Sequence, residues 1–248
     1  MLSAGCPNPY SAIMIMLSVA VLAACGSTSA GRAGVSITPT ATAPSRTEVT
    51  SVSSPQAMVL PTPYLKGTLS LEEALAQRRS VREFADTPLT LAELGQLLWA
   101  TQGMTHPAGL RTAPSAGALY PLEVYAVTRE AMYHYEPQGH RVSVHIAIDT
   151  RPRLYAAALR QEPVLKAPTV IVIAAVYART ASKYGGERSP RYVHLEAGHA
   201  AQNVLLQAVT LNLGAVPIGA FEDDAVKRAL ALPSDQQPLY LIPVGHPR

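Results

Sequence analysis

The sequence predicts an α+β domain, because helix and strand signals are mixed along the chain without the strict alternation of a βαβ fold. Two capping boxes, Ser70–Glu73 and Thr90–Glu93, each mark the start of a helix. Residues 122–128 alternate in polarity, as a half-buried strand does, whereas residues 169–176 are apolar and predict a strand buried on both faces. Both kinds of element therefore belong to one mixed fold.

The other expected elements follow in order. The capped helices should end near residues 79 and 100, and a long, largely apolar helix over residues 192–213 ends at Gly214, a residue type suited to a helix C-terminus. The sequence has no Walker loop and no G-x-G-x-x-G turn, so a nicotinamide-binding Rossmann domain is not expected. Further strands are expected over residues 132–135, 141–148 and 239–244, and short helices over 152–159 and 224–230.

Charge and cysteine content exclude several functions. The formal net charge is only +3 and no long run of Lys or Arg is present, so nucleic-acid binding is not expected. Both cysteines, Cys6 and Cys25, lie in the first 25 residues, which leaves the domain without a disulfide framework or a cysteine-ligated metal. The histidines of the long helix form no H-E-x-x-H pattern, so no metal site is expected.

The N-terminus has the features of an export signal. Residues 12–22 are apolar over a length typical of a signal-peptide core and too short to span a bilayer comfortably. The adjoining Leu22–Gly26 (LAACG) resembles the bacterial lipobox, although no Lys or Arg precedes the apolar run. We therefore expect a lipoprotein signal over residues 1–25, lipidation at Cys25, and an extracytoplasmic protein anchored to a membrane. An ordinary secretory signal with a chance cysteine is the alternative.

Composition changes again after the signal. Residues 26–66 are rich in Ser, Thr and Pro and are expected to form a disordered tether. Residues 67–248 have ordinary globular composition and a length that fits one domain.

The segment Arg78–Phe84 (RRSVREF) concentrates positive charge after the first predicted helix. Arginine presents a fixed fork of donors that matches phosphate oxygens. If the segment is extended, Arg78, Ser80 and Arg82 face one way. The alternative is a basic helix C-terminus that complements the helix dipole.

Residues 111–121 (RTAPSAGALYP) form a second candidate segment. Small residues between Pro114 and Pro121 suit a rigid loop whose backbone comes close to a flat ligand. Ser115 could cap a short helix or hydrogen-bond that ligand. A tight loop between a helix and a strand is the alternative.

These two segments resemble motifs of the FMN-dependent nitroreductase superfamily. Residues 192–203 (YVHLEAGHAAQN) are similar to its SagB-like branch, which oxidises azolines to thiazoles and oxazoles, and residues 217–221 (PIGAF) and 243–245 (PVG) fit the same pattern. The resemblance covers nearly all of residues 67–248. It implies a nitroreductase-like α+β fold with a central, mostly antiparallel sheet flanked by helices, and a homodimer with FMN in a groove at the subunit interface.

The resemblance also implies roles for individual residues. The arginine segment would hold the phosphate, the ribityl chain and the N1/O2 edge of FMN, and the loop of small residues would come from the partner subunit and line the isoalloxazine. Gly219 and Ala220 would offer backbone N–H groups near flavin N5. The expected cofactor-binding residues are Arg78, Arg79, Ser80, Arg82, Pro114, Ser115, Ala116, Gly117, Ala118, Gly219 and Ala220.

Lys183 and Tyr184 resemble the Lys-Tyr pair that azole-forming members carry beside the flavin, and they are the expected catalytic residues. The loop that follows departs from that pattern, because Gly185–Gly186 adds a residue and Ser189–Pro190 stands where Gly-Tyr is expected. A solvent-exposed loop is the alternative for the pair.

The resulting hypothesis is an FMN-dependent oxidoreductase that transfers hydride between flavin N5 and a small-molecule or peptide substrate, as a SagB-type dehydrogenase does. A nitro or quinone reductase is the enzymatic alternative. A lipoprotein that binds flavin without turnover is the alternative from a different class.

Overall fold

The computed structural model describes residues 57–248. The expected signal, the lipidation site Cys25 and the tether as far as residue 56 lie outside the described residues. Within the described part, no helix combines the length and the apolar character needed to cross a membrane.

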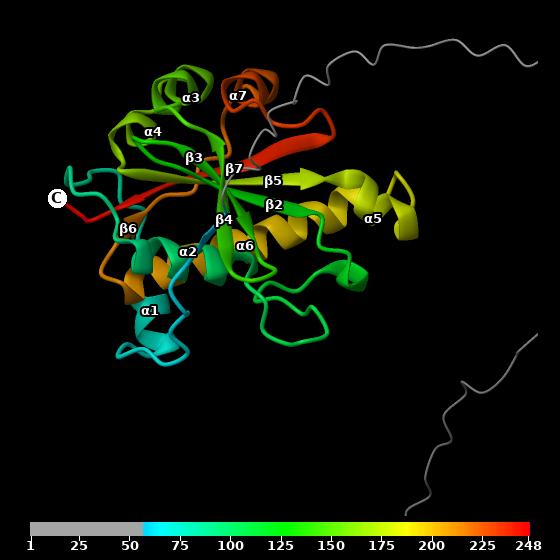
Figure 1. Cartoon of the computed structure of the whole chain (residues 1–248), viewed down its shortest axis with the longest axis horizontal. Helices are drawn as coiled ribbons and strands as arrows, with labels where there is room; N and C mark the ends of the chain where they lie inside the picture. The colour runs from blue at the N-terminus through cyan, green and yellow to red at the C-terminus, as the bar shows by residue number, and fades with distance from the viewer. Residues whose placement is uncertain (1–56) are drawn as a thin grey trace, which may run out of the picture. The chain divides into compact units, whose positions relative to one another are not determined.

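A seven-stranded sheet with the order β1-β4-β3-β2-β5-β7-β6 forms the centre of the domain (Figure 1). All neighbouring strands pair antiparallel, which confirms the expected α+β fold and its mostly antiparallel sheet. The strands are β1 (Met58–Val59), β2 (Leu122–Val127), β3 (Met132–Glu136), β4 (Arg141–Ile146), β5 (Thr169–Val176), β6 (Gly214–Ala215) and β7 (Gln236–Gly245).

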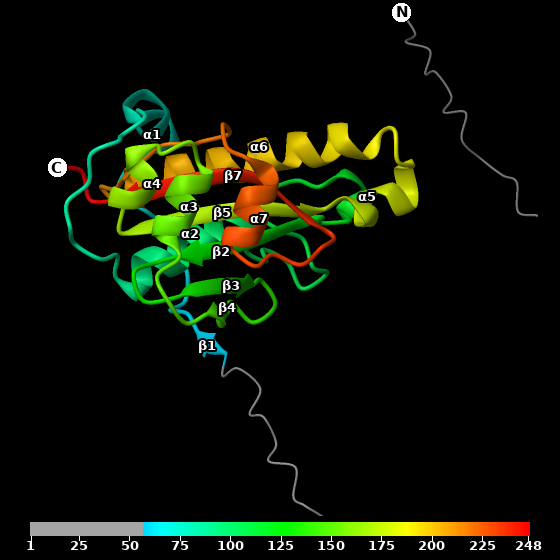
Figure 2. The same cartoon turned by 90° about the horizontal axis from the view of Figure 1, so that it is seen from above.

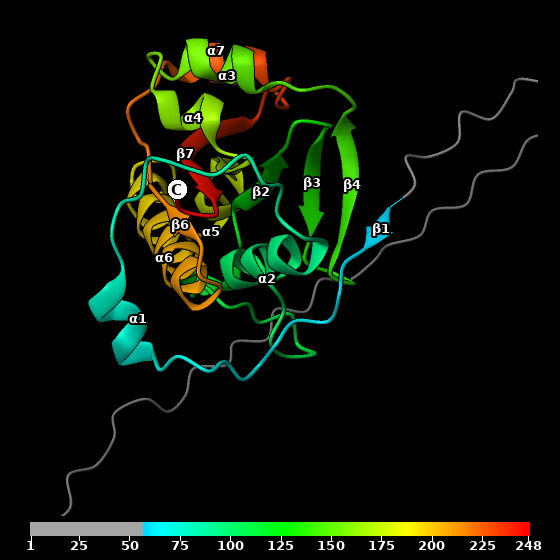
Figure 3. The ribbon, with the colours of Figure 1, turned by 90° about the vertical axis from the view of Figure 1, so that its left-hand side faces the viewer.

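Helices cover both faces of this sheet. Figure 3 shows α2 and α6 packed on one face, with α1 outside α6, and α3, α4 and α7 on the other face. The helices are α1 (Leu71–Gln77), α2 (Leu91–Gln102), the 3₁₀ turn Ala116–Ala118, α3 (Arg151–Ala157), α4 (Glu162–Lys166), α5 (Tyr177–Tyr184), α6 (Ser189–Thr210) and α7 (Asp223–Ala229).

Strand β5 lies between the two helical layers, and its composition explains why. All eight of its residues are buried. Ile171 and Ile173 belong to the core shared with α2 and α6, whereas Val170 and Val172 belong to the core shared with α3 and α7. Side chains of a strand alternate between faces, so an apolar run without polar residues is what a strand covered on both sides requires. The predicted doubly buried strand is confirmed.

The two predicted capping boxes are present. The side chains of Ser70 and Thr90 each accept a hydrogen bond from the backbone N–H of the glutamate three residues later, and that glutamate accepts one from the cap residue's own N–H. Helix α5 was not expected, because it begins directly after β5 at Val176 without a capping side chain.

The ordered domain begins earlier than residue 67, where the sequence placed its start. Residues Met58–Val59 pair with β4, and the buried Leu60 donates its N–H to the His140 carbonyl at 3.0 Å. The His140 ring in turn contacts the Pro61 carbonyl at 3.0 Å and the Tyr135 hydroxyl at 2.9 Å. This part of the predicted tether therefore covers the outer edge of β4, which would otherwise present unpaired backbone groups.

Candidate active site

The predicted phosphate-binding segment runs along the edge of the sheet. Ser80 forms a parallel bridge with Ala215, and the Val81 N–H donates to the Ala215 carbonyl at 3.0 Å. A Cβ at Gly214 would lie 2.5 Å from the Val81 side chain, so glycine is required for this approach. The pairing keeps the segment extended, which places Arg78, Ser80 and Arg82 at alternate positions as expected.

The arginines of this segment differ in their availability. Arg79 donates from its guanidinium to the carbonyls of Ala76 at 2.8 Å and Arg78 at 2.7 Å, so it caps the end of α1. Within residues 57–248, the side chains of Arg78 and Arg82 form neither a hydrogen bond nor an ion pair. Arg78 and Arg82 are therefore better suited to hold a phosphate than Arg79, which the sequence had grouped with them.

A further arginine joins the segment from the far end of the sequence. Phe84 bridges to Pro247, and the Arg248 N–H donates to the Glu83 carbonyl at 3.3 Å. Arg248 therefore lies beside the strand-like segment that carries Arg82. Sequence reasoning missed it, because no local pattern joins these distant segments.

The predicted Gly219–Ala220 element forms an exposed turn between β6 and α7. Ile218 pairs with Leu241 of β7, and Gln161 donates to the Ala220 carbonyl at 2.7 Å. Within the described chain, the backbone N–H groups of Gly219 and Ala220 donate to no protein atom. A Cβ at Gly219 would meet only the Tyr240 ring, at 3.9 Å. The turn thus offers two unpaired donors with open space beside them.

A cavity of about 290 Å³ adjoins this turn. Gly219, Phe221, Tyr240 and His194 line it. His194 lies on α6, and its Nε2 is 2.7 Å from the Tyr177 hydroxyl. The lining thus combines the exposed Gly219 with His194, whose ring contacts the Tyr177 hydroxyl.

The second predicted segment and the predicted catalytic pair meet in one protomer. Gly117 has a φ of +65°, and a Cβ there would come within 3.0 Å of both the Lys183 Nζ and the Tyr184 hydroxyl. The Tyr120 N–H donates to the Ser115 hydroxyl at 2.9 Å, which closes the loop. Lys183 and Tyr184 form the end of α5, where Lys183 is exposed and Tyr184 is half-buried. They therefore contact the loop of small residues, Pro114–Ala118.

A buried carboxylic acid supports this loop from below. Glu196 of α6 is 2% exposed and accepts a hydrogen bond from Gln102 at 3.4 Å, and hydrogen bonding by the Ser115 side chain also acts to lower the Glu196 pKa. Burial raises its pKa to about 7, because it outweighs these hydrogen bonds and the attraction of Arg111. Glu196 thus links α6 to the loop in a hydrogen-bonded network.

Replacing Glu196 by Gln should make stability less dependent on pH. A carboxyl whose folded-state pKa lies above its unfolded value near 4.5 stabilises the fold fully below that value, and the contribution is lost as the pH rises through about 7. Denaturant unfolding at pH 5 and pH 8 should show the wild type losing on the order of 2 kcal/mol more than Glu196→Gln. Equal losses of unfolding free energy in the wild type and in Glu196→Gln would contradict the raised pKa of Glu196.

The predicted catalytic pair and the arginine segment lie at opposite ends of α6. Lys183 and Tyr184 precede its first turn, whereas its last turn leads into β6, where Ser80 pairs. Its 22 residues make the helix about 33 Å long. Figure 2 shows α5 at one end of α6 and α1 at the other. One protomer therefore brings the catalytic pair to the small-residue loop but does not bring either to the arginine segment.

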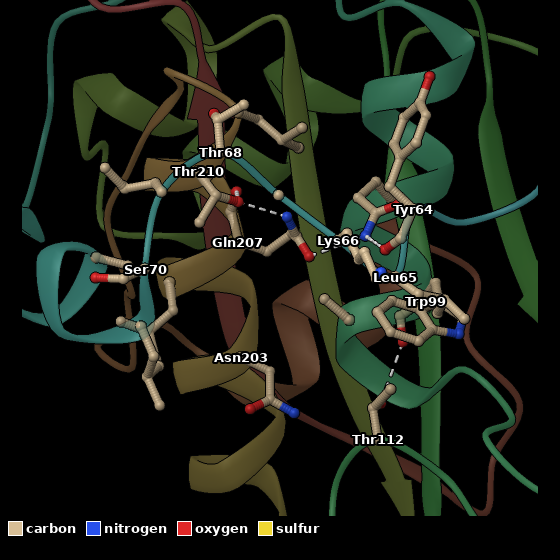
Figure 4. A pocket seen from close by; sticks show the side chains of 18 residues that line it. Tyr64, Leu65, Lys66, Thr68, Ser70, Trp99, Thr112, Asn203, Gln207 and Thr210 are labelled. Carbon is tan, nitrogen blue, oxygen red and sulfur yellow. Dashed lines mark hydrogen bonds between the residues drawn. The ribbon is translucent and has the colours of Figure 1, made fainter.

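A groove of about 580 Å³ lies apart from all of these residues, between residues 64–71, α2 and α6 (Figure 4). Gln207 lies at its centre, where it bonds Thr210 at 2.6 Å and Gln96 at 3.0 Å. Leu65 and Leu71 at its rim are strongly exposed. None of the predicted cofactor-binding residues lines it, so it is an unpartnered surface rather than the flavin site.

A seven-stranded antiparallel sheet with one long helix packed on one face describes the fold, and sequence comparison gives the family. The chain belongs to the nitroreductase family, a family of oxidoreductases, whose model matches residues 75–246.

A nitroreductase-like protein of Methanocaldococcus jannaschii is 45% identical over 183 residues, which cover 71% of this chain and 91% of that protein. Among solved structures, a nitroreductase-like protein from Ralstonia eutropha is 27% identical with a TM-score of 0.70, covering 77% of this chain and 90% of that one. An NADPH:FMN oxidoreductase from Vibrio harveyi is 23% identical with a TM-score of 0.55, covering 71% and 68% respectively, and shares the fold.

Proposed function

We propose that the chain is an FMN-dependent oxidoreductase that transfers hydride between flavin N5 and an organic substrate, and that it acts as a SagB-type dehydrogenase on azolines. The observation that carries this proposal is the contact of Lys183 and Tyr184 with Gly117, in the loop expected to line the isoalloxazine. That contact supports the proposal, because it brings two groups able to transfer protons to the loop expected to line the flavin.

The residues present fit FMN. Arg78 and Arg82 offer guanidiniums without a protein partner in the described chain, and such groups suit a phosphate. Gly219 and Ala220 are exposed, and their N–H groups donate to no protein atom in the described chain, so they are available to a flavin edge. Bound FMN would supply the hydride chemistry at N5.

The separation of the catalytic pair from the arginine segment supports a homodimer. A two-fold axis that sets two copies of α6 antiparallel would bring the start of one helix to the end of the other. The small-residue loop of one protomer would then meet the arginine segment of its partner. The exposed Leu65 and Leu71 at the groove of Figure 4 offer apolar surface for such a contact.

Azoline oxidation needs a base as well as a hydride acceptor. The ring loses a hydride from one carbon and a proton from its neighbour, so a proton acceptor must lie within hydrogen-bond reach of the substrate. The adjacent amine and phenol of Lys183 and Tyr184 can receive and relay that proton. Reduction of nitro compounds or quinones is a second candidate, favoured by the similarity to nitroreductase-like proteins. This reaction needs no such base.

FMN content should depend on Arg78 but not on Arg79. Each charge-assisted hydrogen bond to the phosphate contributes about 1.5–3 kcal/mol, so Arg78→Ala should be purified depleted in flavin although folded. Arg79→Ala is the matched control, because that guanidinium bonds the end of its own helix. The measurement is the visible spectrum of each protein and the FMN released on denaturation. Normal FMN content in Arg78→Ala would overturn the assignment.

We also propose that the enzyme is an extracytoplasmic lipoprotein anchored through Cys25, on the support of the lipobox-like sequence alone. Several acyl chains on one cysteine suffice for stable membrane residence. Cys25→Ser should therefore leave an unprocessed precursor or release the protein from membranes, as fractionation and gel mobility would show. A variant that fractionates and migrates like the wild type would point to an ordinary signal or to none.

A further inference from the structure

A second cavity, of about 360 Å³, lies on the side of the small-residue loop that faces β2 and β3. It is separate from the cavity at Gly219 and from the groove of Figure 4, with which it shares no lining residue. None of the predicted cofactor-binding or catalytic residues lines it. Its walls include Arg111, Arg179, Glu123, His134, Leu122 and Met104.

The carboxylates of this cavity are already paired. One oxygen of Glu123 bonds Arg179, and the other lies 2.6 Å from the His134 Nε2. Burial opposes ionisation of Glu123, but these hydrogen bonds outweigh it and hold its pKa below the usual value. Glu136 is bonded by Arg141 at 2.7 Å. Both carboxylates of the cavity therefore already have a basic partner within the protein.

The positive charge of Arg111 is not neutralised by the ion pairs of Glu123 and Glu136. Its guanidinium donates to Gln102 at 3.1 Å and lies 4.5 Å from the centre of the Tyr120 ring. Within residues 57–248, no carboxylate lies within ion-pair distance of it. Burial lowers its pKa, although Glu123 and Glu196 act in the opposite direction. A guanidinium has five N–H donors, so most of them are available to a ligand.

We propose that this cavity binds a small organic monocarboxylate, with Arg111 holding the carboxylate and the apolar walls holding its hydrocarbon part. A guanidinium fork matches a carboxylate in geometry and charge. Leu122, Val124 and Met104 supply the apolar walls. The volume lies near the lower end of the range for small-molecule sites. An amine is less favoured, because Glu123 and Glu136 already bond Arg179, His134 and Arg141 while Arg111 has no carboxylate partner in the described residues.

The ligand would lie close to the small-residue loop, because a single residue, Tyr120, joins Arg111 to Ser115 of that loop. Tyr120 accepts from the Arg111 N–H at 3.2 Å and donates its own N–H to Ser115 at 2.9 Å. Arg179 also donates to the Tyr120 carbonyl at 3.1 Å. The same hydrogen bonds therefore hold the cavity and the small-residue loop. The proposal concerns the cavity alone and does not depend on flavin binding.

Benzoate is a suitable probe, with benzamide as its neutral counterpart. Isothermal titration of the purified protein should show saturable binding of benzoate and at least about tenfold weaker binding of benzamide. Arg111→Gln should weaken benzoate binding by at least about tenfold, whereas Arg153→Gln, which changes an exposed arginine on α3, should not. Absence of benzoate binding, or equal binding of benzamide, would overturn the proposal.

Two further variants keep the test decisive if Arg111→Gln is poorly folded. Met104→Trp fills the cavity while leaving Arg111 in place, and it should abolish benzoate binding. Arg82→Gln alters the predicted phosphate site and should leave benzoate binding unchanged. If Met104→Trp binds benzoate like the wild type, or if Arg82→Gln loses it, the anion lies elsewhere and the proposal is wrong. Benzoate binding is read by titration and FMN content by the visible spectrum of the same samples, so a failure of this proposal and a failure of the proposed function are distinguishable.

Discussion

Lys183→Ala and Tyr184→Phe should each lower azoline oxidation by ~10²–10⁴-fold, the range typical of general-base removal. Both side chains contact Gly117, so each variant removes a proton-transfer group beside the expected substrate position. FMN content should not change, because neither residue belongs to the arginine segment. The measurement is the rate at which a thiazoline-containing peptide loses two hydrogens, followed by mass spectrometry.

The same variants separate the two candidate reactions. Reduction of a nitroarene requires no base on the protein, since the substrate takes its protons from water. Lys183→Ala and Tyr184→Phe should therefore retain nitroarene reduction in the presence of a chemical reductant. Lys166→Ala is the matched control, because this exposed lysine lies on α4, on the other face of the sheet. Wild-type azoline oxidation in both variants would leave the dehydrogenase proposal without a mechanism.

Local sequence signals were sufficient for much of the fold. The two capping boxes join residues three apart in sequence, and the apolar run of β5 indicates burial of both faces of that strand; the structure confirms each of them. Helix α5 has no such signal at its start, since Val176 cannot cap it. Helix α6 begins at Ser189 rather than near residue 192, and Pro190 in its first turn was a usable sign of that start.

The motifs of the candidate site could be predicted from the sequence, but their positions relative to one another could not. The motif loop around Gly117 and the Lys183–Tyr184 pair do lie together. Arg79 was grouped with the phosphate-binding residues, yet its guanidinium closes the end of α1, which only the backbone geometry reveals. Arg248 was missed, and Arg111 was included only as the first residue of the segment 111–121, because tertiary contacts, rather than spacing, place both side chains.

The central claim is that each FMN site is built from two protomers, and a heterodimer tests it most directly. One protomer carries Arg82→Ala at the phosphate end, and the other carries Ala118→Trp on the exposed face of the small-residue loop. Neither homodimer should bind FMN. In the heterodimer, one site receives both substitutions and the other receives neither.

The heterodimer is isolated by co-expression with two different affinity tags and tandem purification, and its FMN content is read from the visible spectrum. Circular dichroism and gel filtration of each protein confirm that the variants are folded dimers. A shared site predicts about half of the wild-type FMN content in the heterodimer. A folded heterodimer without FMN would show that each protomer needs both segments in its own chain, which contradicts a shared site.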